Sequence, residues 1–234
     1  MLCRFLEKQS DEFIFRKDAI VQLCTGVSVL HLGFIQHEHI YKELIAQGDW
    51  LHDKINKVAS RLVGVDYLRE VIEAMRQKTD YEVYVGDAMN LTDLPLQNTF
   101  DVIVCGELIE HVENPGLMLK EIRRFTHQKS RVVITTPNPW AINRIKLIKS
   151  GNLEKVWMNP EHVSWFTYQT LTNVLERMNY SCLIKDYYVA ESRESIMNRT
   201  SGLMESLKFA KFVIRLHWIS KHQYDGLFFV ASPN

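Results

Sequence analysis

The sequence has few cysteines and no long apolar run. Its 234 residues include four cysteines, and no two of them form a CxxC pair. Scattered cysteines argue against a disulfide framework or a zinc site, so we expect reduced thiols in a cytoplasmic protein. No stretch reaches the roughly 20 apolar residues of a membrane span, and the first residues lack the apolar segment of a signal peptide.

An excess of either charge is also absent, since 28 Lys and Arg residues balance 28 Asp and Glu residues. This balance argues against the broad phosphate attraction of nucleic-acid-binding proteins, so we expect no nucleic-acid partner. The sequence has neither internal repeats nor low-complexity segments. Its length and its 46% hydrophobic content predict one globular domain over residues 1–234.

Short apolar runs alternate with helical patterns along the chain. Predicted strands cover residues 27–32, 61–65, 81–85, 100–105, 131–135, 180–189 and 226–231. This alternation predicts an α/β fold with a doubly wound, mostly parallel seven-stranded sheet and helices on both faces. A helical insertion precedes the last strand.

Two of the predicted helices have recognisable ends or faces. The helical segment at 39–60 breaks at Gly48, and Asp49 is a candidate N-cap for its second piece. The helix after the fourth strand begins at Asn114-Pro115. Its predicted core face contains Leu117, Leu119, Ile122 and Phe125.

Acidic residues follow two consecutive strands. Asp66 ends the second strand, and Asp87 follows the third. The first carboxylate can accept hydrogen bonds from ribose hydroxyls, and the second can accept one from an adenine amine. The pair therefore indicates an adenosine site at the carboxyl edge of the sheet. The alternative is that each acid caps the next helix.

The fourth strand begins the segment FDVIVCGELIEHV, residues 100–112. Its β-branched apolar run is typical of a central parallel strand. The run ends at Cys105-Gly106, where a ligand can approach the backbone closely. The following turn carries Glu107, Glu110 and His111 to the edge where ligands bind in open α/β sheets.

The order VLHLG, LVGVD, YVGDA, FDVIVCGELIEHVENP and RVVITTPNP resembles class I S-adenosylmethionine-dependent methyltransferases. It is most similar to the branch with a C-x-E-x-x-E-H-V-x-x-P signature, which includes quinone, small-molecule and sugar methyltransferases. The resemblance implies methyl transfer from S-adenosylmethionine to an oxygen, or less favourably a nitrogen, of a small molecule or glycan. It also implies that the last strand runs antiparallel.

The resemblance also implies roles for individual residues. Asp66 would bind the ribose, Tyr67 would pack on the adenine, and Asp87 with Ala88 would hold the adenine amine. The methionine end of the cofactor would be lined by Cys105, Gly106 and Glu107. The first loop, with His31, Gly33 and Phe34, would complete the cofactor site.

That first loop departs from the family, whose members have an acid-x-Gly-x-Gly-x-Gly pattern. Here His31 replaces the acid, and only Gly33 remains of the three glycines. Either the loop reaches the same pocket by another path, or cofactor binding is weakened or lost. The second possibility would make the chain a degenerate binding or scaffold protein. A nicotinamide-dependent oxidoreductase is a further alternative, but it should contain GxGxxG.

Two histidines are candidate catalytic groups. His111 and His162 can act as general bases toward an acceptor hydroxyl, because histidine titrates near neutral pH. The alternative is that their rings only hold loops together. His31, His37 and His39 lie near one another in sequence, but nothing ensures that they converge, so we predict no metal site.

Residues 140–166 and 193–221 interrupt the strand–helix rhythm and are predicted to form a substrate lid. Within the second insertion, residues 202–219 combine a broad apolar face with basic residues. A homodimer contact and an interfacial membrane helix are the alternatives to a lid for this segment.

Overall fold

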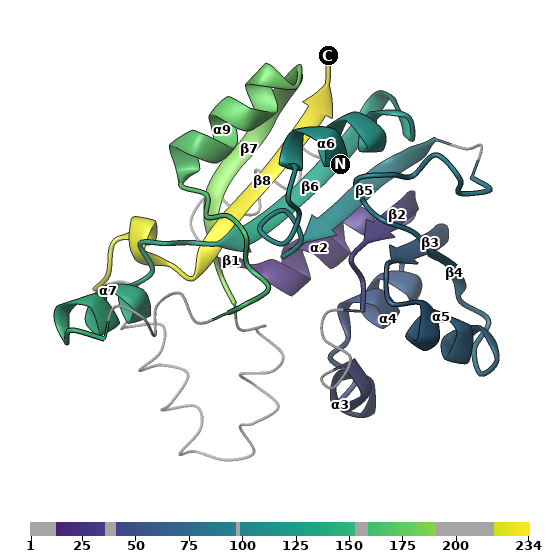
Figure 1. The fold of residues 1–234 in the computed structure, drawn as a ribbon, viewed down its shortest axis with the longest axis horizontal. Helices are drawn as coiled ribbons and strands as arrows, with labels where there is room; N and C mark the ends of the chain where they lie inside the picture. The colour runs from purple at the N-terminus through teal and green to yellow at the C-terminus, as the bar shows by residue number, and fades with distance from the viewer. Residues whose placement is uncertain (1–12, 36–40, 97–98, 153–158, 191–217) are drawn as a thin grey trace.

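A mixed eight-stranded sheet dominates the described part of the chain, which comprises residues 13–35, 41–96, 99–152, 159–190 and 218–234. In this computed structural model the strand order is β1-β7-β8-β6-β5-β2-β3-β4 (Figure 1). The strands are β1 (Ile14–Phe15), β2 (Ser28–Leu32), β3 (Arg61–Asp66), β4 (Glu82–Val85), β5 (Phe100–Gly106), β6 (Thr126–Pro137), β7 (Tyr180–Val189) and β8 (Gly226–Pro233).

The strand directions confirm the predicted α/β class. Strands β4, β3, β2, β5 and β6 are parallel to one another, and β8 is antiparallel to both β6 and β7. The predicted count of seven strands was wrong, because β1 adds an eighth. Its two residues pair in parallel with Tyr188 and Val189. Two residues are too short to produce a recognisable apolar run.

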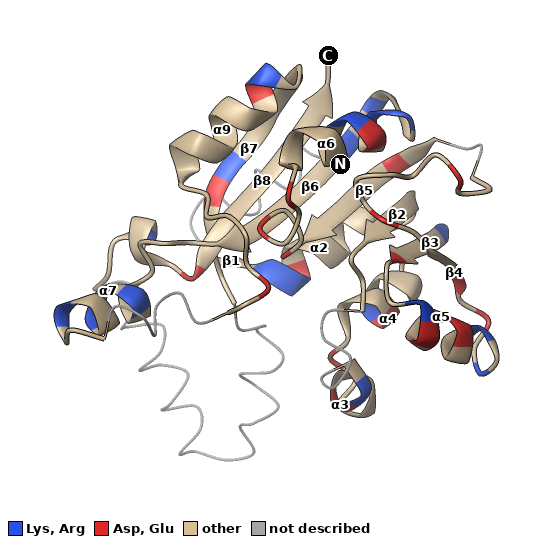
Figure 2. Cartoon of the chain, in the orientation of Figure 1, with Lys and Arg blue, Asp and Glu red and all other residues tan. Residues whose placement is uncertain are grey.

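The helices follow the predicted rhythm. They are α2 (Arg16–Cys24), α3 (Tyr41–Ala46), α4 (Leu51–Asn56), α5 (Arg69–Arg76), α6 (Pro115–Arg123), α7 (Ile142–Lys149) and α9 (Tyr168–Arg177), with a 3₁₀ turn η1 (Lys221–Gln223). Figure 2 shows basic and acidic residues intermixed on α5 and α6, whereas the charged residues of α7 are all basic.

Two details of the helices differ from expectation. Asn114 does cap α6, with its side chain accepting from the Leu117 backbone N–H at 2.9 Å. Leu117 itself is 39% exposed, and Met118 takes its place in the core. Asp49 caps nothing: its carboxylate pairs with Lys17 at 2.6 Å and Lys54 at 3.0 Å, two partners that local sequence does not reveal.

Helices cover both faces of the sheet (Figure 1). Apolar side chains of α6 and α9 belong to the same core cluster as Leu30 and Leu32 of β2, and those of α2 and α4 belong to a second cluster with Val29. Alternate residues of a strand point to opposite faces, so a central strand covered on both sides is apolar throughout. The residues just beyond the strand ends are therefore the ones left to form a site.

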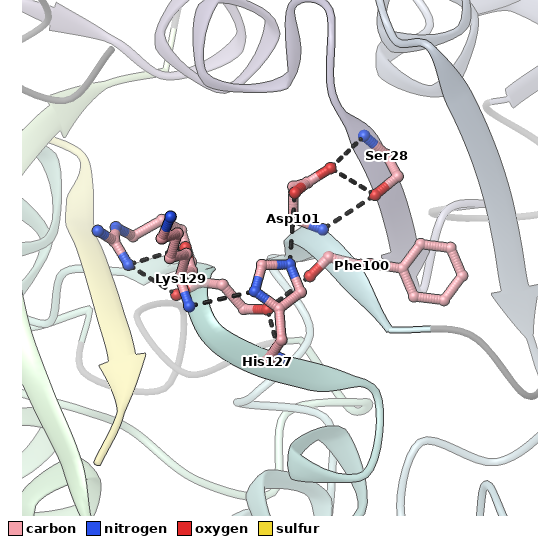
Figure 3. A network of polar contacts seen from close by, with 7 residues as sticks. Ser28, Phe100, Asp101, His127 and Lys129 are labelled. Atoms are coloured by element: carbon pink, nitrogen blue, oxygen red, sulfur yellow. Dashed lines mark hydrogen bonds and ion pairs between the residues drawn. The ribbon is translucent and has the colours of Figure 1, made fainter.

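The opposite edge of the sheet is held by a polar network at the strand starts (Figure 3). Asp101 accepts from the backbone N–H and the hydroxyl of Ser28, at 2.9 and 2.6 Å. Nε2 of His127 lies 3.3 Å from the other Asp101 oxygen. This network joins the starts of β2, β5 and β6, and it lies at the far end of these strands from their carboxyl ends.

A buried pair of histidines lies between β2 and α4. Nδ1 of His31 lies 3.2 Å from Nδ1 of His52, and the two side chains are 2% and 0% exposed. One Nδ1 must donate and the other accept, so both rings are neutral with complementary tautomers. Burial lowers the pKa of His31 to about 3 and lowers the pKa of His52 well below its ordinary value.

This pair should make the protein less stable in mild acid. Because the folded-state pKa values lie below the unfolded value near 6.5, the unfolded chain gains protons first as the pH falls. Between pH 7 and pH 5 each histidine should remove about 2 kcal/mol from the free energy of unfolding. His52→Met should therefore lose about 2 kcal/mol less than the wild type over this interval. Urea unfolding at both pH values measures the difference; equal losses in the two proteins would contradict it.

Candidate active site

A cavity of about 740 Å³ opens at the carboxyl ends of the central strands. Its walls come from the ends of β2, β3 and β5, from the residues after β4, and from residues 159–162. The lining residues are Gly33, Asp66, Tyr67, Asp87, Ala88, Met89, Gly106, Glu107, Leu108, Glu110, His111, Val112, Glu113, Asn159, Glu161 and His162. Nine of the twelve residues predicted for the site are among them.

The other three predicted residues do not line this cavity. His31 pairs with His52 beneath α4, Phe34 is 1% exposed against that histidine, and Cys105 is fully buried in the core. His31 and Cys105 lie within strands, so their side chains point to helix-covered faces. The structure therefore gives no support to cofactor contacts by these three side chains, and their assignment stays a prediction.

Asp66 is the most enclosed polar group of the cofactor end. It is 5% exposed and accepts hydrogen bonds from the backbone N–H groups of Ile35, at 3.0 Å, and Leu68, at 3.2 Å. Burial raises the pKa of its carboxyl group, and these backbone hydrogen bonds oppose the rise. Each oxygen retains a lone pair, because a carboxylate offers about four acceptor positions. The carboxylate can therefore still bind two hydroxyl groups.

The first loop reaches the cavity by a path that needs only one glycine. Gly33 has a φ of 64°, and an added Cβ would lie 2.8 Å from a Leu108 methyl group. After it, Phe34 and Ile35 turn into an apolar cluster with Trp50, whose indole N–H donates to the Phe34 carbonyl at 3.1 Å. The Ile35 N–H is bound to Asp66. Aromatic packing thus holds the loop that glycines would otherwise shape.

The residues after β4 and β3 form the open side of the cavity. Asp87 begins a tight turn, in which its Oδ1 accepts from the Met89 N–H at 2.8 Å. Tyr67 is 70% exposed and lines the cavity. A flat heterocycle can stack on such a ring while its amine donates to the free oxygen of Asp87.

Glu107 follows β5 in a strained backbone conformation. Its φ is 54°, which is uncommon for a residue with a side chain and is typical of functional sites. Its carboxylate accepts from the hydroxyl of Tyr188 at 2.9 Å, and Tyr188 is only 2% exposed. The guanidinium of Arg16 lies 5.8 Å from the centre of that tyrosine ring. A buried network thus fixes Glu107 at the floor of the cavity.

Two histidines and a buried glutamate converge at the other end. The His111 and His162 ring centres are 4.7 Å apart, edge to face. Glu110 is 1% exposed, and among the described residues neither of its carboxylate oxygens has a well-formed hydrogen bond, although the Thr136 hydroxyl lies near enough to oppose the rise of its pKa. Burial and the charge of Glu107 raise the pKa of Glu110 well above its ordinary value. The sequence places Glu110 at the ligand-binding edge but indicates no specific role for it, because its burial depends on a loop some 50 residues away.

Sequence comparison identifies the family. Residues 46–191 match the family described as "Methyltransferase domain", which is more than half of the chain. No curated protein matches the sequence.

Solved structures of low sequence identity share the fold. One is an S-adenosylmethionine-dependent methyltransferase from Mesorhizobium loti (17% identity, 92% of this chain and 95% of that chain, TM-score 0.55). Another is from Archaeoglobus fulgidus (16%, 99% and 99%, 0.52). A third is the N-methyltransferase NodS from Bradyrhizobium japonicum, in complex with S-adenosylhomocysteine (13%, 93% and 85%, 0.52). The chain therefore belongs to the methyltransferase domain family, as a class I S-adenosylmethionine-dependent methyltransferase.

Proposed function

We propose that this methyltransferase transfers the methyl group of S-adenosylmethionine to an oxygen of a small molecule or glycan in the cytoplasm. One observation supports this most strongly. Three carboxylates from successive strand ends, Asp66, Asp87 and Glu107, line one cavity together with His111 and His162. The carboxylates suit the hydroxyls and amines of the cofactor, and the histidines suit an acceptor that must lose a proton.

The cofactor would lie along the strand ends. We assign the ribose hydroxyls to Asp66, the adenine ring to Tyr67, and the adenine amine to Asp87 and Ala88. Gly33, Gly106 and Glu107 would surround the methionine end. Gly106 and Glu107 both line the cavity at the end of β5.

Positioning would supply much of the rate. Methyl transfer is an in-line displacement: the acceptor oxygen forms a bond to the methyl carbon while the carbon–sulfur bond breaks and its electrons remain on sulfur. Holding the two reactants at the strand ends converts a bimolecular reaction into an intramolecular one. His111 and His162 would assist loss of the acceptor proton.

Two alternatives have less support. The family match argues against a nicotinamide-dependent oxidoreductase. A degenerate binding protein is favoured only by the first loop, whose Ile35 N–H serves Asp66. A nitrogen acceptor remains the second candidate for the reaction, since the structural relative NodS is an N-methyltransferase.

The lid prediction concerns segments only partly described. Residues 159–166 do wall the cavity in part, through Asn159, Glu161 and His162. The predicted lid, dimer or membrane segment at 202–219 lies almost wholly outside the described residues. Among the described helices, none is long and apolar enough to cross a membrane.

Thermal unfolding with S-adenosylmethionine, S-adenosylhomocysteine and NAD tests the cofactor assignment. A ligand that binds only the folded state raises the unfolding temperature. At a concentration of 100 times its Kd, it adds about 2.7 kcal/mol to the free energy of unfolding. Both adenosyl compounds should raise it, and NAD should not. No shift with either adenosyl compound at millimolar concentration would contradict the proposal.

Tyr188→Phe should weaken cofactor binding more than it weakens the fold. The substitution keeps the buried ring but removes the donor that holds Glu107 at 2.9 Å. A hydrogen bond to a charged group contributes about 1.5–3 kcal/mol, so affinity for S-adenosylhomocysteine should fall by about tenfold or more. Titration calorimetry measures this loss. Unchanged affinity would show that Glu107 needs no fixed orientation.

A further inference from the structure

We propose that Glu110, His111 and His162 form a site for one divalent transition-metal cation, which holds the acceptor oxygen. The inference rests on the proposed methyl transfer and extends it, because it names how the acceptor is bound. It also revises the prediction from sequence that the chain has no metal site. All three side chains line the same cavity as the proposed cofactor residues.

The geometry of the three side chains suits one ion. One ligand atom from each residue lies within 4.8 Å of the other two. His111 Nε2 is 4.0 Å from a Glu110 oxygen. Ligand atoms around a tetrahedral zinc ion, at bond lengths of about 2.0–2.1 Å, are roughly 3.3 Å apart. Small side-chain movements toward a shared ion would therefore complete the site.

The buried carboxylate of Glu110 is the second, independent observation. It is 1% exposed, and among the described residues neither of its oxygens has a well-formed hydrogen bond; the Thr136 hydroxyl and the Glu110 backbone N–H only partly offset its burial. A buried carboxylate either takes up a proton or is paired with a cation, and an ion held by the two histidines would supply that cation. The Glu110 carbonyl also accepts from the backbone N–H groups of Val163 and Ser164, at 2.9 and 3.2 Å. These bonds keep the loop that carries His162 beside Glu110.

The other ring nitrogen of His111 faces a second carboxylate. Nδ1 lies 3.9 Å from an oxygen of Glu161, while Nε2 faces Glu110. Metal-bound histidines commonly direct their second nitrogen to a carboxylate, which fixes the ring orientation and the tautomer. The arrangement around His111 thus matches that of a metal ligand, and with the ion bound the two histidines would assist proton loss as its ligands and not as bases.

The ligand set indicates the type of ion and its role. Two imidazoles and one carboxylate favour zinc, iron or manganese over calcium and magnesium, and three protein ligands leave coordination positions open. An acceptor hydroxyl bound there would lose its proton to water more readily, because the cation lowers its pKa. The oxygen would then form its bond to the methyl carbon. The carbon–sulfur bond would break with its electron pair staying on sulfur, which gives S-adenosylhomocysteine as the product. The acceptor class is therefore hydroxyl-bearing.

Cobalt(II) binding tests the site without an activity assay. Tag-free protein, stripped of metal with EDTA, should take up one Co²⁺ with visible d–d absorption, and one equivalent of Zn²⁺ should displace it. Glu110→Gln and His162→Ala should each weaken binding at least tenfold. The matched control is His127→Ala, which removes an imidazole at the opposite edge of the sheet (Figure 3) and should bind Co²⁺ like the wild type.

Circular dichroism shows whether each variant is folded. If one variant misfolds, the unfolding temperature of the wild type with and without Zn²⁺ still tests the site. Absence of stoichiometric Co²⁺ binding by the folded wild type would overturn the proposal, as would equal binding by Glu110→Gln, His162→Ala and the control. S-Adenosylhomocysteine is titrated in parallel. If the protein binds S-adenosylhomocysteine but takes up no cation, the metal site is wrong and the cofactor assignment stands. If it takes up the cation but does not bind S-adenosylhomocysteine, the metal site is supported but has no role in methyl transfer.

Discussion

Asp66→Ala should reduce the affinity for S-adenosylhomocysteine by at least about 100-fold. Hydrogen bonds to a charged carboxylate contribute about 1.5–3 kcal/mol each, and two ribose hydroxyls would lose their acceptor. The Ile35 N–H, 3.0 Å from Asp66, would lose its partner too, so the first loop would be held less firmly. Titration calorimetry of both proteins measures the loss.

Asp101→Ala is the matched control for this substitution. Asp101 is also a strand carboxylate that accepts from a backbone N–H, at 2.9 Å from Ser28, but it lies at the opposite edge of the sheet (Figure 3). Its loss should lower the unfolding free energy by about 1–3 kcal/mol and leave cofactor affinity unchanged. Asp66→Ala with wild-type affinity would mean that the ribose assignment is wrong.

Trp50→Ala should destabilise the fold by about 3–5 kcal/mol. Trp50 is 1% exposed, and it packs against Phe34 and His52 with ring centres 6.0 and 5.1 Å away. Truncation would leave a large cavity and would also remove the donor to the Phe34 carbonyl. Urea unfolding at pH 7.5 measures the change.

Trp218 provides the control for Trp50. It is 85% exposed, so Trp218→Ala should change the free energy of unfolding by no more than about 0.5 kcal/mol. If Trp50→Ala also cost less than 1 kcal/mol, the aromatic cluster would not be what holds the first loop in place.

Central strands could be predicted from sequence because burial on both faces leaves little choice of residue. The run at 102–104 and the acid at 66 gave the positions of β5 and the end of β3 almost unaided. Helix faces were harder. Leu117 and Met118 are adjacent in the sequence and both are apolar. Only the packing of α6 determines that Met118 is the one in the core.

Site residues at strand ends could be predicted from the sequence. Residues whose position depends on contacts between distant segments could not. Asp66 ends a strand, and Asp87 and Glu107 follow strands of the same sheet, so their convergence could be expected. His31 and Cys105 lie one or two residues earlier, where the strand directs side chains to the covered faces. The pairing of His31 with His52 and the burial of Glu110 both depend on distant segments.

The most direct measurement is a crystal structure of the protein with S-adenosylhomocysteine. We predict the ligand in the cavity at the strand ends, with its ribose hydroxyls hydrogen-bonded to Asp66 and its adenine amine to Asp87. Its sulfur should lie on the side of Gly106 and Glu107, facing His111. A ligand bound elsewhere, or bound here with its ribose away from Asp66, would contradict the proposed site.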